Sequence, residues 1–419
     1  MRQPLLFIRD NGEYIKKWWE KMKQIGIVFM YISLMFILAS CTQSETMNPA
    51  FQSEEYLAQY DMKNEYTQVQ GMIDKENGIY YFCPLGSAYV YYYDEETNTQ
   101  GKLCAKPECT HEEASCNAYL GASNIGIQIY DHSIYWIQGG SLYRMDLNGG
   151  NHEEVRTIDA LYGIDPLFAV HRGFLYTFVL QSEVQQGDSE MTLWIRRYSL
   201  DDTEQAGQTI FQEEQGSLAS YRYHMYGNSL YFLCNQAMDD TYTEYEATLY
   251  VYDTEADQCE VLWSENQLLW DMGADFKKDK GTIQIMGAGG YRTIPFFQIY
   301  ILGDSGEVQK EGPFYLGEAY AGRGSRFYFT RDYIIQSKPD AGGEGLRYCV
   351  RDGQGKIVME GECAQEYGAE IDYWLQEGQD VIMEQNITHS LDDNHLMHAY
   401  QITRISADGS QQALLRVEE

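Results

Sequence analysis

Two features of the sequence predict an all-β fold, a single β-propeller of about seven four-stranded blades over residues 66–419. The first is composition: aromatic residues make up 14% of the chain, 36 residues are tyrosines and only 8 are prolines. Tyrosine favours strands, and this aromatic content is too high for a disordered chain. The second is a repeat of short strands about every 40 to 60 residues, the spacing at which propeller blades recur.

Each repeat contains a short aromatic strand, a gap and a second aromatic strand that ends in Asp. The first strands include residues 78–82, 133–137, 173–177 and 229–233, and the second include 91–94, 142–146, 249–253 and 346–352. Turn residues follow several of them, as in Asn148-Gly149 and Asp408-Gly409. The repeats begin near residues 66, 125, 166, 217, 268, 325 and 368.

The count of seven depends on the fifth repeat, which is the weakest, so six or eight blades remain open. A β-sandwich is the alternative architecture, because its strands also alternate. Sandwich strands recur at 8 to 12 residues without a longer period. The longer period therefore favours a propeller, in which radial repetition leaves only short sheet edges.

Residues 1–40 are typical of an export signal. An apolar run over 25–39 follows two lysines and leads into Leu38-Ala39-Ser40-Cys41. An uncleaved signal anchor is disfavoured, because about 15 apolar residues are fewer than the roughly 20 of a spanning helix. The pattern is similar to bacterial lipoprotein signals, which implies a lipidated Cys41 followed by a flexible tether over 41–65. Met22 is an alternative start, since a compact leader begins there.

Acidic residues dominate the chain after this leader. Of 30 basic and 63 acidic residues, six and three lie in 1–40, so the remainder carries 24 and 60, a formal charge of −36. This excess opposes binding to nucleic acid and electrostatic adsorption to anionic lipid. We therefore expect attachment to the outer face of the bacterial cytoplasmic membrane through the N-terminal lipid alone.

One repeat unit carries a family resemblance. Residues 133–149, SIYWIQGGSLYRMDLNG, resemble the Tyr-Trp repeats of receptor-type propellers and of uncharacterised propeller lipoproteins in Gram-positive bacteria. The other units share this pattern only loosely. The resemblance implies a fold but no reaction, because propellers serve both as enzymes and as binding platforms.

The densest group of reactive side chains lies between the first and second repeats, where Cys104, Cys109, His111 and Cys116 fall within thirteen residues. Three thiols and an imidazole could hold one structural Zn²⁺, although C-x₄-C-x-H-x₄-C is not a standard zinc spacing. In an exported chain a local disulfide with one spare cysteine is an alternative, and a reactive thiol is a third. A similar cysteine-rich loop occurs in the lipoproteins named above. We expect a structural clasp, through either a disulfide or a metal.

No catalytic residues are identified. The sequence has no nucleophile elbow, His-Glu-x-x-His motif or phosphate loop. We therefore expect a non-enzymatic platform for a glycan, peptide or protein. Tyr242 and Tyr245 could supply aromatic contact area for a ligand, but packing within their own loop is the favoured interpretation. The alternative is a carbohydrate-active or other hydrolytic enzyme with carboxylates at the central channel. Two clustered carboxyl groups with strongly shifted pKa values would favour that alternative.

Overall fold

The chain divides into two units, Met1–Ser53 and Glu54–Glu419, and every described residue lies in the second. The computed structural model describes residues 57, 61, 73–84, 87–112, 114–121, 126–158, 167–185, 188–214, 217–238, 242–279, 281–290, 293–303, 305–316, 325–330, 332–339, 345–364, 370–392 and 395–418. The predicted leader, Cys41 and most of the tether lie outside this set. Within it, no helix is long and apolar enough to cross a membrane.

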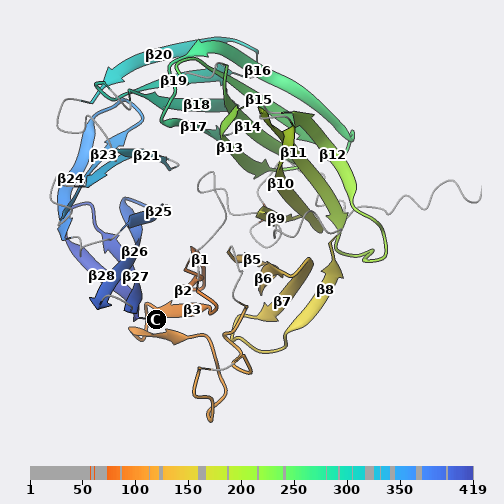
Figure 1. The fold of residues 1–419 in the computed structure, drawn as a ribbon, viewed down its shortest axis with the longest axis vertical. Coiled ribbons are helices and arrows are strands. Elements are labelled where there is room, and N and C mark those ends of the chain that lie inside the picture. Colours follow the sequence, from red (N-terminus) through yellow and green to blue (C-terminus); the bar gives the residue numbers. More distant parts are fainter. Residues whose placement is uncertain are drawn as a thin grey trace, which may run out of the picture. The chain divides into compact units, whose positions relative to one another are not determined.

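The described residues of the second unit form a seven-bladed β-propeller (Figure 1). Each blade is an antiparallel sheet of four strands that follow one another in the sequence. Blades 1 to 4 consist of β1 (Ile73–Glu76), β2 (Ile79–Phe82), β3 (Tyr91–Asp94), β4 (Thr99–Lys102), β5 (Gln128–Tyr130), β6 (Ser133–Gln138), β7 (Ser141–Asp146), β8 (Glu153–Thr157), β9 (Leu167–His171), β10 (Phe174–Gln185), β11 (Asp188–Ser199), β12 (Gln208–Glu214), β13 (Ser217–Tyr226), β14 (Ser229–Ala237), β15 (Tyr245–Asp253) and β16 (Gln258–Leu268).

Blades 5 to 7 complete the ring. They consist of β17 (Gly273–Asp279), β18 (Thr282–Gly289), β19 (Phe296–Gly303), β20 (Val308–Tyr315), β21 (Arg326–Phe329), β22 (Tyr333–Pro339), β23 (Gly345–Asp352), β24 (Ile357–Ala364), β25 (Glu370–Glu377), β26 (Asp380–Asp392), β27 (His395–Ile405) and β28 (Gln411–Glu418). The predicted fold class is confirmed, and the count is seven rather than six or eight. The predicted aromatic strands are the second and third strands of their blades.

A separate apolar core fills each of the seven interfaces between neighbouring blades. Trp136 on β6, for example, is buried between blades 1 and 2 and stacks on Tyr143 of β7. Burying one such large apolar side chain contributes roughly 1.5 to 3 kcal/mol. The alternation of aromatic residues along each strand therefore supplies both faces of every blade with core residues.

The connections between strands lie on two opposite faces, because successive strands in a blade are antiparallel. We call the face with the first-to-second and third-to-fourth strand turns the turn face. The face with the second-to-third connections and the links between blades is the loop face. The segment between β4 and β5 is on the loop face, and the turns at residues 77–78 and 378–379 are on the turn face.

Candidate functional sites

Four potential metal ligands converge on the loop face between blades 1 and 2. We call them the Cys₃His cluster, which comprises Cys104, Cys109, His111 and Cys116; one ligand atom from each lies within 4.8 Å of all the others. His111 has a φ of 62°, so the chain reverses sharply there. Its Nδ1 is 3.5 Å from Cys116 Sγ. The segment therefore folds back on itself and brings together residues spread over thirteen positions.

Backbone N–H groups are directed at all three sulfurs. The N–H of His111 donates to Cys109 Sγ at 3.4 Å, and that of Ala118 donates to Cys116 Sγ at 3.4 Å. Cys104 accepts from the N–H of Lys106 in the same way. Each thiol thus receives a hydrogen bond from the residue two positions later. Such bonds stabilise a thiolate more than a neutral thiol.

The sulfurs also influence one another's ionisation. Burial acts to raise the pKa of Cys104, but the N–H groups of Lys106 and Asn117 and the neighbouring thiols outweigh it and lower that pKa to about 7. Burial, together with the nearby Cys109 and Cys104, raises the pKa of Cys116 to about 11. One thiolate therefore forms readily, and its charge hinders the next ionisation unless a cation is present.

None of the seven cysteines whose side chains are described is in a disulfide. Cys83, directly after β2, and Cys234, on β14, are buried in the apolar cores between blades. Cys259 is exposed on β16, two strands away from Cys234. Only the Cys₃His cluster therefore combines several described thiols with a histidine.

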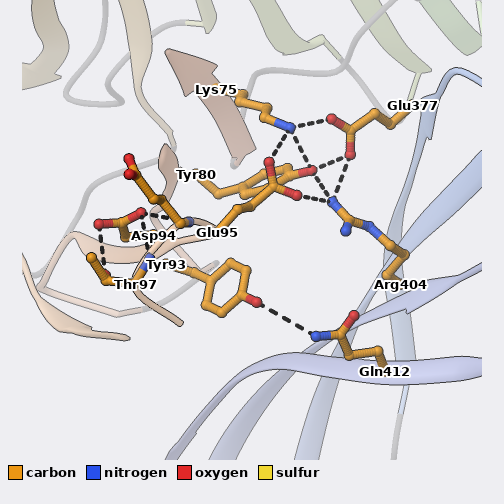
Figure 2. Close-up of polar contacts among 10 residues, drawn as sticks. Lys75, Tyr80, Tyr93, Asp94, Glu95, Thr97, Glu377, Arg404 and Gln412 are labelled. Carbon is orange, nitrogen blue, oxygen red and sulfur yellow. Dashed lines mark hydrogen bonds and ion pairs between the residues drawn. The ribbon is translucent and has the colours of Figure 1, made fainter. Parts of the chain in front are cut away.

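Two carboxylates meet on the turn face where blade 7 adjoins blade 1 (Figure 2). Glu377 ends β25 and bonds both the Lys75 ammonium and the Tyr80 hydroxyl. Glu95, after β3, is 2.7 Å from Lys75 Nζ and 2.6 Å from Arg404 Nη2. Arg404 also reaches Glu377 at 2.9 Å. We call these five residues the closure network, because they join the first blade to the last.

The closure network holds its carboxylates in the charged form. Burial acts to raise the pKa of Glu377, but its bonds with Lys75 and Tyr80 outweigh this and lower it from the usual 4.5. The pKa of Glu95 is lowered in the same way by Lys75 and Arg404. A general acid needs the opposite shift. The predicted sign of a hydrolase is thus not found in this pair, whose contacts suit ring closure.

A group of exposed apolar side chains lies on the loop face of blades 4 and 5. Its members, which we call the apolar surface, are Met238, Tyr242, Leu269, Ile294 and Tyr315. Their exposed fractions run from 45% for Ile294 to 68% for Tyr315. Both Met238 and Tyr242 belong to the connection between β14 and β15. The predicted role of Tyr242 as an exposed aromatic is therefore compatible with the structure.

A hydrogen bond joins two of the connections that carry the apolar surface. The Gly290 N–H donates to Asp271 Oδ1 at 2.8 Å, which ties the segment that carries Leu269 to the one that carries Ile294. Tyr245, in contrast, is buried in the core between blades 4 and 5. Its predicted contact role is wrong, because Tyr245 begins β15 and pairs with Ala237 and Leu268.

One short segment before the first blade is bound to the turn face. The Asp61 carboxylate accepts two bonds from the Arg172 guanidinium, at 2.5 and 2.8 Å, and both side chains are buried. Arg172 lies in the turn between β9 and β10, in blade 3. The Leu57 N–H also donates to the Asp61 carboxylate at 3.0 Å. Sequence reasoning missed this pair and assigned residue 61 to a free tether.

Comparison with known proteins assigns the chain to no family. No family model matches the chain, and no curated protein matches it. It is similar to solved structures of puromycin hydrolase (10% identity, TM-score 0.47, 86% of this chain and 56% of that chain) and polysaccharide lyase Uly1 (10%, 0.41, 87% and 93%). A chain in a nidogen/laminin complex has 14% identity and a TM-score of 0.35 over 66% of this chain and 90% of that one.

The chain thus spans just over half the length of the puromycin hydrolase chain that it matches. At these identities and scores the likenesses carry no argument about activity. The class of protein, a seven-bladed β-propeller, is defined by the sheet topology itself. Any function has to be argued from the sites described above.

Proposed function

We propose that this protein is a cell-surface lipoprotein whose propeller is a non-enzymatic binding platform for a polypeptide segment with apolar and basic side chains. The observation that carries the proposal is the apolar surface on the loop face of blades 4 and 5. Exposed apolar groups that gather on one face are typical of interaction sites. Tyrosine is particularly suited to such contacts, because its ring is large and rigid and its hydroxyl is polar.

Charge favours a basic partner. Glu244 and Asp271 are exposed in the same connections as Tyr242 and Leu269. The whole chain has a formal charge of −33. A peptide with Lys or Arg beside its apolar residues would be attracted to this face and oriented on it. A nucleic acid or another acidic surface would be repelled.

The attachment of the N-terminal segment supports the loop face as the binding face. Asp61 is bound to Arg172 on the turn face. The apolar surface and this attachment of the N-terminal segment therefore lie on opposite faces of the propeller.

The membrane attachment is tested by cell fractionation with a lipid label. Replacing Cys41 with Ala should abolish labelling and release the protein from the membrane, because the acidic chain has little affinity for anionic lipid. Continued labelling of the Cys41→Ala protein would contradict the lipoprotein assignment. It would leave the binding role of the propeller to be judged separately.

Binding is tested with the fragment 42–419, which contains the whole compact unit that follows Ser53. It should select peptides that combine Trp or Leu with Lys or Arg from a random peptide library. The double variant Tyr242→Ser/Tyr315→Ser should weaken the binding of the selected peptides by about tenfold or more, because two aromatic contacts are lost. The matched control is Val261→Ser/Val308→Ser, which removes two similarly exposed apolar residues from the outer strands β16 and β20 of the same blades.

Equal losses in both double variants would contradict a site on the loop face. Binding only to a glycan array, with no peptide selected, would replace the polypeptide ligand with a carbohydrate. Hydrolysis of a bound glycan or peptide would overturn the non-enzymatic assignment.

A further inference from the structure

We propose that the Cys₃His cluster is a structural Zn²⁺ site that fixes the segment between blades 1 and 2. The first argument is geometry. In a tetrahedral zinc site with Zn–S near 2.3 Å and Zn–N near 2.0 to 2.1 Å, ligand atoms are about 3.6 to 3.8 Å apart. The four donor atoms lie within 4.8 Å of one another, and the His111 Nδ1 to Cys116 Sγ distance is 3.5 Å. Small side-chain adjustments would complete the coordination.

The second argument is the set of donors around the sulfurs. Zinc binds cysteine as the thiolate, and outer hydrogen bonds orient such ligands. Backbone N–H groups already point at Cys109 and Cys116, each from the residue two positions later. A disulfide between two of the thiols would not require this arrangement around all three, nor a histidine beside them.

The third argument is charge. Three thiolates, one neutral imidazole and Zn²⁺ have a net charge of −1. Two lysines hold the same segment: Lys102 Nζ donates to the His111 carbonyl, and Lys106 Nζ donates to the Ser115 carbonyl, both at 2.7 Å. Their positive charges lie close to the cluster and would offset the remaining negative charge. Binding would release protons from the thiols to the solvent.

The segment has a structural need for such a site. The described residues between 103 and 121 form no regular strand; Tyr119 alone makes an isolated bridge, to Tyr89. Cys116 and Leu120 nevertheless belong to the core between blades 1 and 2. A metal would hold this part of the core in place where a ladder of backbone hydrogen bonds is lacking.

The test is metal analysis of the full-length protein, purified from membranes in detergent without chelator. We expect about one zinc per chain, and Co²⁺ exchange should produce the intense visible absorption of a tetrahedral thiolate site. Cys109→Ser and His111→Ala should each reduce the bound metal at least tenfold. The control Cys259→Ser, which changes an exposed thiol on β16, should leave it unchanged.

Mass spectrometry of the same sample distinguishes the alternatives. A disulfide among the three cysteines with no metal would overturn the proposal. Free thiols in a protein that takes up neither Zn²⁺ nor Co²⁺ would also overturn it. If the variants fail to fold, the zinc content and Co²⁺ spectrum of the unmodified protein decide the question.

Discussion

His224 is a buried ionisable residue whose environment suits only its neutral form. It lies on β13, packs near the ring of Phe276, and has no hydrogen-bond partner on either ring nitrogen among the described residues. Burial, helped by His171 and Lys278, lowers its pKa from 6.5 to about 4. Burial also lowers the pKa of His171 to about 4, against the opposing effect of Asp61. Both imidazoles are therefore neutral in the folded protein at neutral pH.

Replacing His224 with Leu should stabilise the protein, because an unsatisfied buried polar group costs about 1 to 3 kcal/mol. The folded-state pKa of His224 is depressed, so the unfolded chain binds more protons between about pH 6.5 and 4. Wild-type stability should fall as the pH drops through that window, and the fall should be smaller in His224→Leu. Urea unfolding at pH 7, 5.5 and 4 measures both effects. The exposed His132→Asn is the control, and an equal pH dependence in both variants would contradict this account.

At the scale of the strand pair, three blades share a contact between a tyrosine on the third strand and a glycine at the fourth. The pairs are Tyr92–Gly101, Tyr198–Gly207 and Tyr348–Gly361. A Cβ at Gly361 would lie 2.5 Å from the Tyr348 hydroxyl oxygen. The glycine therefore makes room for a buried aromatic ring that crosses from the neighbouring strand.

Gly361→Ala should destabilise the protein by about 1 to 3 kcal/mol, since the rigid Tyr348 ring must move in a packed core. Gly353→Ala is the matched control in the same blade. A Cβ at that position would meet nothing within 4 Å, so the change should stay within about 0.5 kcal/mol. Chemical unfolding of the two variants gives the comparison. Similar losses of stability in the two variants would show that Gly361 does not confine the Tyr348 ring.

At the scale of strands and short segments, the sequence predicted best those features that depend on residues close together in the chain. The aromatic alternation along 133–137 or 229–233 specifies a strand and both of its faces, so strands, repeats and propeller could be predicted. The Cys₃His cluster could be suspected because its members are close in sequence. Its convergence needed the reversal at His111, which no residue preference indicated.

Long-range pairs were beyond sequence reasoning. Lys75 and Glu377 are 302 residues apart, and Asp61 and Arg172 are 111 apart. In a chain with 63 acidic residues, nothing in the sequence distinguishes the one that will meet a given cation. Ring closure decides these partners, and it is a property of the finished fold.

For the whole molecule, closure of the ring depends on side chains. Every sheet in the described residues is made of consecutive strands, so no strand is shared between the first blade and the last. The junction contains an apolar core that includes Phe82 of blade 1 and Ile402 of blade 7. The closure network adds ion pairs and hydrogen bonds at its edge (Figure 2).

Glu377→Gln should lower the melting temperature at pH 7, because Lys75 and Arg404 lose a shared carboxylate. The pKa of Glu377 is depressed in the folded state, so its contribution is present above pH 4.5 and is lost as the pH falls below it. The melting temperature of the wild type should therefore fall further between pH 6 and pH 3 than that of the variant.

Thermal melts of both proteins across that range check this prediction. The control is Glu153→Gln, which removes an exposed pair with Arg144 inside blade 2. Such surface pairs contribute about 0 to 1 kcal/mol. If Glu377→Gln and Glu153→Gln behaved alike, the closure network would have no special part in sealing the ring.

The buried pair between Asp61 and Arg172 also determines how a mechanical load would enter the molecule. A pull on the chain from the N-terminal side reaches Asp61 before it reaches β1. Because Asp61 is bound to blade 3, the force is delivered first to a blade that the chain connects directly to a neighbouring blade on each side. The junction between blades 1 and 7, where no strand is shared, is shielded until that buried pair breaks. In the proposed lipoprotein, the ring would thus withstand shear on its N-terminal tether without being pulled open at its seam.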